Sequence, residues 1–222
     1  MARMARIVVP EYPHHVTQRG VRSLPIFRGE EDRRSYLEFM SRETQRFRVG
    51  ILAWCLMTNH VHLIAVPEDE RALARAIGEA HKRYSRMRNF TEGVRGYLFQ
   101  GRFGSCVLDE KHLAAAVRYV ENNPVRAGMV KRAWEYPWSS AKFHIGEQKV
   151  DVLVKDRNLL GLVANWREFL QGMDSGGEKD LRRATKTGRP LVGHEHLARI
   201  EKKTGRNLQK GKPGRKPPDS MK

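Results

Sequence analysis

Apolar and polar positions in the first seventy residues follow two different periods. From His14 to Arg19 they alternate as in a half-buried strand, whereas from Glu30 to Phe47 apolar side chains recur at helical spacing. A continuous apolar run extends from Ile51 to Met57, and an alternating segment from His60 to Val66 follows the turn-like pair Thr58-Asn59. These patterns predict a strand, a helix and a hairpin of two strands.

Three further elements are predicted between residues 70 and 124. Glu70 to Met87 is amphipathic with helical spacing, and Ser105 to Leu108 is a short apolar segment after a glycine-rich stretch. A last helix, Glu110 to Asn122, must end near Pro124, because helical geometry is disfavoured directly before proline.

The resulting order, βαββαβα, predicts the ferredoxin-like α+β fold with an antiparallel sheet. In such a fold helices cover one face of the sheet, and the other face can be left for a ligand. We expect this core at residues 1–145 and a connecting helical segment at residues 146–174. Residues 175–222 contain few large apolar side chains, which predicts a basic, partly extended tail around one small helix at His194 to Lys203.

Net charge narrows the class of partner. The chain carries +17 at neutral pH, and residues 175–222 hold 14 Lys/Arg against 5 Asp/Glu, about half of that excess. Such a field favours a polyanion, above all nucleic acid. No apolar run approaches the ~18 residues of a membrane span, and the N-terminus lacks the apolar core of a signal peptide. We therefore expect no membrane partner and a cytoplasmic, nucleoid-associated location in a bacterial cell.

Candidate chemistry begins with two histidines on one strand. Side chains alternate along a strand, so His60 and His62 project from the same face while Val61 points to the other. Imidazole is a common ligand for divalent transition metals, and two of them can share one ion with oxygen ligands. Histidines with a purely structural or surface role give the same short pattern, so both interpretations stay open.

Tyr119 and Asn123 supply the context for the histidine pair. They lie four residues apart, on one helical face, directly before Pro124. A phenol is a poor nucleophile unless a cation or base is near, and the asparagine carbonyl oxygen can be a third metal ligand. A core tyrosine and a helix-capping asparagine explain these two residues equally well when considered alone.

Other residues could compete for these roles. Tyr84 is the rival nucleophile, within a basic segment, although its place on an apolar helix face favours packing. His14 and His15 could approach the middle of the sheet, where a structural role is the commoner one. A zinc-structured module that uses Cys55 and Cys106 is weak, because no CxxC pair occurs.

Four segments carry a resemblance to a known family. Residues 56–64 (LMTNHVHLI) resemble the HUH signature of single-tyrosine transposases, and residues 118–128 (RYVENNPVRAG) are similar to the nucleophile helix of the branch called REP-associated tyrosine transposases. Residues 99–103 (FQGRF) and 138–140 (WSS) are further matches in the same order. The resemblance covers roughly residues 5–145, and the joint set is far more specific than any one segment.

The resemblance implies a division of labour. His60, His62 and Asn123 would bind Mg²⁺ or Mn²⁺, and Tyr119 would attack a phosphate of single-stranded DNA, leaving a 5′-phosphotyrosine and a free 3′-OH. The implied substrate is a hairpin formed by a REP-like palindrome, and relatives act as monomers or homodimers. Insertion-sequence relatives commonly offer glutamine where this chain has Asn123, which puts ligand number and metal preference in doubt.

Basic and aromatic residues in loops and tail are candidate DNA contacts. Two short segments, 187–190 and 213–217, resemble minor-groove hooks in which a Gly-Arg pair inserts an arginine. The candidates are Arg19, Arg22, Arg83, Arg86, Gln100, Arg102, Phe103, Arg189, Arg215 and Lys216. A DNA-binding protein that occupies palindromes without cutting them is the alternative function, since charge and tail suit both.

Overall fold

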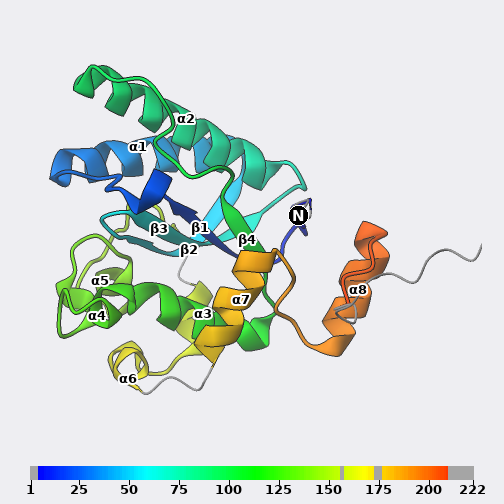
Figure 1. The fold of residues 1–222 in the computed structure, drawn as a ribbon. Helices are drawn as coiled ribbons and strands as arrows, with labels where there is room; N and C mark the ends of the chain where they lie inside the picture. Colours follow the sequence, from blue (N-terminus) through cyan, green and yellow to red (C-terminus); the bar gives the residue numbers. More distant parts are fainter. Residues whose placement is uncertain (1–4, 156–157, 173–176, 210–222) are drawn as a thin grey trace, which may run out of the picture.

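A four-stranded antiparallel sheet forms the centre of the molecule (Figure 1). The computed structural model describes residues 5–155, 158–172 and 177–209. The strand order is β2-β3-β1-β4, and each neighbouring pair is antiparallel. This is the ferredoxin-like arrangement that the sequence predicts. The strands are β1 (His14–Arg19), β2 (Val49–Leu56), β3 (His60–Pro67) and β4 (Gly104–Val107).

Two long helices cover one face of the sheet. They are α1 (Glu30–Arg46) and α2 (Ala72–Glu92), which lie together above the sheet in Figure 1. Val61 and Leu63 of β3 point toward them and join one buried apolar cluster with Tyr36 and Leu73. Burial of these side chains stabilises the helices on the sheet far more than their own helix propensity does.

Helices also cover the opposite face, which a ferredoxin-like arrangement can leave for a ligand. Ile64, Cys106 and Leu108 are apolar on this side as well, and they are buried against the helices. The elements beneath the sheet in Figure 1 are α3 (Glu110–Glu121), α4 (Asn123–Arg126), α5 (Ala141–His144), α6 (Trp166–Gln171) and α7 (Gly177–Thr187).

The tail differs from its prediction. The structure has two helices between residues 177 and 209, α7 and α8 (His194–Thr204), where the sequence predicted an extended arm around one. α7 packs against β4 and α3, because Leu181 and Ala184 form a narrow buried stripe. This stripe is short and surrounded by charged residues, so the sequence pattern did not predict a packed helix here. The division into three segments at residues 145 and 174 stays a prediction.

Shorter helical turns complete the chain. They are η1 (Val21–Ser23), η2 (Ala133–Glu135) and η3 (Asn158–Leu162). The helix before Pro124 ends one residue before its predicted end: α3 stops at Glu121, and Asn123 opens α4 with Pro124 in its first turn. In the part of the chain that the structure describes, no helix has the length and apolar character needed to cross a membrane.

Candidate active site

Strand alternation and the approach of α3 bring His60, His62 and Tyr119 together. The two imidazoles lie on the α3 side of β3, with ring centroids 5.0 Å apart. Tyr119 stands nearly perpendicular to the His62 ring, with centroids 5.6 Å apart. The sequence predicted that these residues share a site, and the fold places them in one.

His15 also belongs to this group, although the sequence favoured a purely structural role for it. β1 runs beside β3, and the His15 Nε2 lies 2.9 Å from the His62 Nδ1. Burial is the main reason that the pKa of His15 falls to about 3, and the charge of Arg126 lowers the pKa further. His15 is therefore a neutral hydrogen-bond partner of His62 at neutral pH.

The protonated nitrogen of His60 follows from its neighbour. The Asn59 amide nitrogen donates to the Ser23 carbonyl at 3.0 Å, so the Asn59 Oδ1 faces the His60 Nδ1, at 2.6 Å. An amide oxygen only accepts, so His60 carries its proton on Nδ1 and leaves the Nε2 lone pair free. Burial, and then the cations Arg19 and Arg182, lower the pKa of His60 to about 4.

Asn123 is oriented in the same way. Its amide nitrogen donates to the carbonyl oxygens of Tyr119 at 3.0 Å and Val120 at 3.2 Å. Within the described part of the chain nothing donates to the Asn123 Oδ1, which leaves an oxygen on a residue that lines the same cavity as the histidines.

These residues fit a divalent metal. Among residues 5–155, 158–172 and 177–209, no three His, Cys, Asp or Glu side chains gather to hold an ion, so two histidines need an oxygen donor from elsewhere. The Asn123 amide is such a donor, and a phosphate oxygen of the substrate would be another. Two imidazole nitrogens and an amide oxygen can together bind a divalent metal ion.

Two arginines contact Tyr119. The Arg182 Nε, from α7, donates to the tyrosine hydroxyl oxygen at 3.2 Å. The Arg126 guanidinium lies 4.0 Å from the centre of the tyrosine ring and also donates to the Tyr119 carbonyl at 2.9 Å. Arg182 therefore places positive charge at the hydroxyl oxygen, where negative charge would develop if this tyrosine attacked, and Arg126 places positive charge over the ring. The sequence did not single out Arg126 or Arg182, because only the packing of α4 and α7 shows their direction.

A cavity of about 970 Å³ opens over this group. Its volume is large enough for nucleotide-sized ligands. Basic and polar side chains surround the histidines and Tyr119 in its wall. They are Thr17, Gln18, Arg19, Gln100, Arg102, Arg126, Arg182 and Lys186.

Gln100 and Arg102 reach the cavity because the segment 99–103 is anchored at both ends. Phe99 stacks on His81 in the core, with ring centroids 4.3 Å apart, and Gly101 adopts the left-handed φ of 63° that turns the chain. Phe103 is only 8% exposed, and the guanidinium carbon of Arg6 lies 3.6 Å from the centre of its ring. Arg6 thus covers the Phe103 ring in this structure, and the role of Phe103 as a DNA contact stays a prediction.

The other predicted DNA contacts do not gather at this cavity. Arg22 and Arg86 are exposed but do not line it. Arg83 lies in the helical layer on the far face, where its Nε is 3.0 Å from the buried Glu43 carboxylate. Arg189 donates to the carbonyls of Leu208 and Gln209, so the predicted hook is held by the chain itself. Arg215 and Lys216 lie outside the described residues.

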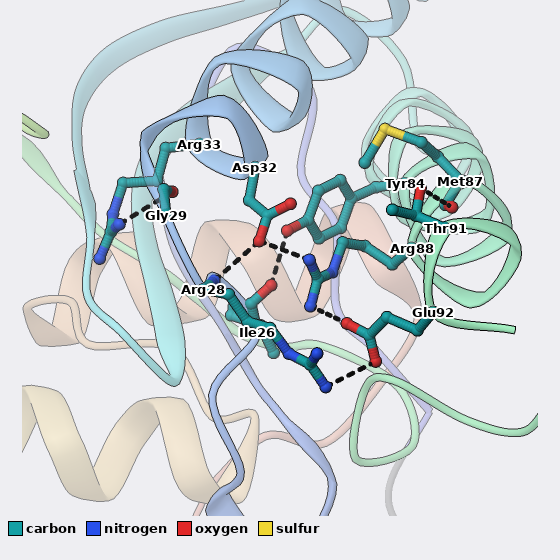
Figure 2. A network of polar contacts seen from close by, with 10 residues as sticks. All are labelled: Ile26, Arg28, Gly29, Asp32, Arg33, Tyr84, Met87, Arg88, Thr91 and Glu92. Atoms are coloured by element: carbon teal, nitrogen blue, oxygen red, sulfur yellow. Dashed lines mark hydrogen bonds and ion pairs between the residues drawn. The ribbon is translucent and has the colours of Figure 1, made fainter. Parts of the chain in front are cut away.

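Tyr84 is excluded as the nucleophile by its surroundings (Figure 2). Its hydroxyl donates to the Ile26 carbonyl at 2.6 Å, and it is fully buried between α1 and α2, on the side of the sheet away from the histidines. Burial, together with the charge of Asp32, also raises its pKa far above that of a free tyrosine. In Figure 2 the neighbouring Arg88 bridges Asp32 and Glu92.

A buried polar network holds the Tyr119 helix on the sheet. The carboxylate of Glu121 accepts from the Ser140 hydroxyl at 2.5 Å and lies 2.6 Å from the His144 Nδ1. Ser140 also accepts the backbone N–H of Trp54 in β2, at 3.0 Å. The segment 138–140 thus acts as a brace between α3 and the edge strand.

The two cysteines are buried thiols. Burial raises the pKa of Cys106 to about 12 and raises that of Cys55 further. Among the described residues, no three His, Cys, Asp or Glu side chains lie close enough together to hold one ion, so the zinc-structured alternative finds no support here.

Comparison with known proteins agrees with this geometry. Residues 9–123 match the family model described as "Transposase IS200 like". A Haemophilus influenzae protein named as a REP-associated tyrosine transposase is 30% identical over 104 residues, 42% of this chain and 58% of that protein. The chain thus spans about 58% of the length of this curated relative.

A solved structure of a REP-associated tyrosine transposase bound to a REP hairpin has the same fold. It superposes with a TM-score of 0.57 at 18% identity, and the match covers 70% of this chain and 92% of that one. This likeness shows that the two chains share a fold.

Proposed function

The chain belongs to the IS200-like transposase family, and on that premise we propose that it is a REP-associated tyrosine transposase: a metal-dependent endonuclease and strand transferase for single-stranded hairpin DNA. The observation that carries the proposal is the position of the Tyr119 ring, beside His62 and under Arg126 and Arg182. A nucleophile, two imidazoles and cations in one cavity match phosphoryl transfer.

The proposed reaction exchanges one phosphodiester for another. The Tyr119 oxygen bonds to the phosphorus of the scissile phosphate, and the bond from phosphorus to the 3′-oxygen of the preceding nucleotide breaks. The phenolic proton goes to solvent and the leaving oxygen takes one up, which gives a 5′-phosphotyrosine and a free 3′-OH. Because the number of phosphate ester bonds is unchanged, the reverse attack by a 3′-OH rejoins a strand without ATP.

Three side chains would hold the metal: His60 and His62 through Nε2, and Asn123 through Oδ1. When bound, Mg²⁺ or Mn²⁺ supplies a positive charge that polarises a phosphoryl oxygen and orients the phosphate. Arg182 donates to the tyrosine oxygen and stabilises the charge that develops there as the proton leaves.

The cavity wall indicates how the strand is bound. Arg19, Arg102 and Lys186 line it and are exposed, so they can reach phosphates on either side of the scissile position. Such contacts bind any strand, and recognition of the hairpin foot requires additional contacts to bases. We expect a monomer or a homodimer as the active form.

A palindrome-binding protein without catalysis is the alternative. Basic loops alone would serve that role, and binding needs no tyrosine beside two oriented imidazoles. The hydrogen bonds that free the ligating atoms of His60 and Asn123 favour catalysis.

The deciding experiment incubates the chain with labelled hairpin-bearing single-stranded DNA and Mn²⁺. We expect cleavage and a protein–DNA adduct on a denaturing gel, lost in Tyr119→Phe and retained in the control Tyr97→Phe, whose side chain is exposed. His60→Gln should lose cleavage but keep hairpin binding, because cavity arginines supply that affinity. Adduct formation by Tyr119→Phe, or none by a folded wild-type chain that binds the hairpin, would refute the proposal.

A further inference from the structure

A chain of hydrogen bonds runs from α7 to one of the histidines in the site. The Thr185 Oγ1 lies 2.7 Å from the His15 Nδ1 and 2.8 Å from the Leu181 carbonyl oxygen one turn earlier in α7. At its other end the His15 Nε2 lies 2.9 Å from the His62 Nδ1. His15, His62 and Thr185 are all buried, which strengthens these bonds relative to bonds exposed to water.

The direction of each bond follows from the Leu181 carbonyl. A carbonyl oxygen only accepts, so the Thr185 hydroxyl donates its one proton to it and the His15 Nδ1–H donates to Oγ1. The reverse arrangement would leave two oxygens facing each other at 2.8 Å without a proton between them. Neutral His15 then has a lone pair on Nε2, which accepts the Nδ1–H of His62.

We propose that Thr185 and His15 are positioning residues that keep the proton of His62 on Nδ1, so that its Nε2 lone pair is free to bind a divalent metal. The inference rests on the proposed function for the presence of that metal. It makes α7, part of a segment that the sequence presented as a DNA-contacting tail, a component of the metal centre. Outer hydrogen bonds of this kind fix the tautomer and orientation of ligating histidines in other metal sites.

Loss of the Thr185 hydroxyl should allow the His62 proton to occupy either ring nitrogen. Without an acceptor, the His15 Nδ1–H is buried and unpaired. In the reversed arrangement, His15 donates through Nε2 to the His62 Nδ1, and His62 keeps its proton on Nε2. Without Thr185 this arrangement costs no more free energy than the original one. His62 would then present an N–H, and not a lone pair, to the metal.

The test compares Thr185→Val with the conservative Thr185→Ser in the full chain. In the metal-free protein, ¹⁵N NMR of the imidazoles reports which His62 nitrogen is protonated. We expect Nδ1–H in the wild type and Thr185→Ser, and a mixture with Nε2–H in Thr185→Val. Calorimetric titration with Mn²⁺ should show binding weakened about tenfold in Thr185→Val and near wild-type binding in Thr185→Ser.

A second pair of variants at His15 keeps the proposal testable if Thr185→Val does not fold. His15→Gln replaces both bonds, with an amide oxygen for His62 and an amide N–H for Thr185, and should retain Mn²⁺ affinity, whereas His15→Leu should lose about tenfold. Wild-type tautomer and affinity in Thr185→Val or His15→Leu would overturn this inference alone. A wild-type chain that binds no Mn²⁺ in the presence of hairpin DNA would overturn the proposed function with it.

Discussion

Residues in the site are prepared for their roles by partners on their other side. The Asn59 oxygen leaves the His60 Nε2 lone pair free, and two backbone carbonyls hold the Asn123 amide nitrogen. Each potential ligand is thus oriented before a metal or substrate arrives. Preorganisation of this kind reduces the cost of binding, because the side chains are already ordered.

Arg182 is the residue whose role differs most from its appearance in the sequence. We expect Arg182→Gln to slow adduct formation roughly ten- to a hundredfold, because a charged hydrogen bond to the proposed attacking oxygen contributes about 1.5–3 kcal/mol. Hairpin binding should change much less. The measurement is the single-turnover rate of adduct formation with excess protein.

Arg183→Gln is the matched control for Arg182. Arg183 is its neighbour on α7, is exposed, and pairs with Asp180 within the same helix. Arg183→Gln removes the same charge as Arg182→Gln but removes no hydrogen bond to Tyr119. Equal rates for the two variants would show that Arg182 contributes only its share of the general positive field.

At this scale the sequence predicted part of the site. His60 and His62 follow from strand alternation, which depends only on local geometry, and Tyr119 and Asn123 follow from helical spacing. His15 could not be predicted as their neighbour. It lies beside His62 because Thr17, two residues along the same strand, pairs with His62, and this register between strands distant in sequence is not visible in the sequence.

At the scale of elements, the segments with strong local patterns were predicted within a few residues. β1, β3 and α3 follow directly from their periods, whereas α2 extends five residues beyond its predicted end, to Glu92. α7 escaped prediction because its stability comes from tertiary contact with β4 and α3. Propensity and pattern carry little information about such a helix.

The brace between α3 and β2 leads to a prediction about stability. Ser140→Ala should lower the free energy of unfolding by about 1–3 kcal/mol, because the Trp54 N–H loses its side-chain partner and the Glu121 Oε1 keeps only one of two partners, His144. Urea unfolding monitored by tryptophan fluorescence measures the change. Ser139→Ala, whose hydroxyl makes only bonds of 3.4 Å, should cost less. An equal loss in both variants would argue against a specific brace.

At the scale of the whole molecule, burial of neutral histidines couples folding to pH. Burial lowers the pKa of His81 to about 3 and that of His14 to about 4, against 6.5 when each is free. Below pH 6.5 the unfolded chain binds protons that the folded chain does not, so stability is full above pH 6.5 and falls on acidification. Each group should cost ~2 kcal/mol between pH 7 and pH 5.

His81 is the group of choice for this test because it lies on the far side of the sheet from the site, where it bonds to the Tyr36 hydroxyl. His81→Gln should be less stable at pH 7 but should lose ~2 kcal/mol less than the wild type on going to pH 5. Urea titrations at both pH values give the comparison. Parallel losses in wild type and variant would mean that His81 is not the source.

Positive charge and the fold together place a strongly basic cavity on the side of the sheet that carries the histidines. The net charge of +17 and the ferredoxin-like order could be predicted from the sequence. The covering of the second face could not, because helices α3 to α7 reach it from segments whose patterns are short or interrupted. The candidate site is consequently a cavity between sheet and helices and not an open sheet face.

Peptide mapping of the covalent adduct identifies the residue that carries the DNA. The full chain is incubated with hairpin-bearing single-stranded DNA and Mn²⁺, digested with nuclease and trypsin, and analysed by tandem mass spectrometry. We expect one nucleotide, attached through its 5′-phosphate, on Tyr119. A nucleotide on Tyr84 or any other of the six tyrosines, or a cut strand with no nucleotide on the protein, would contradict the assignment of Tyr119 as the nucleophile.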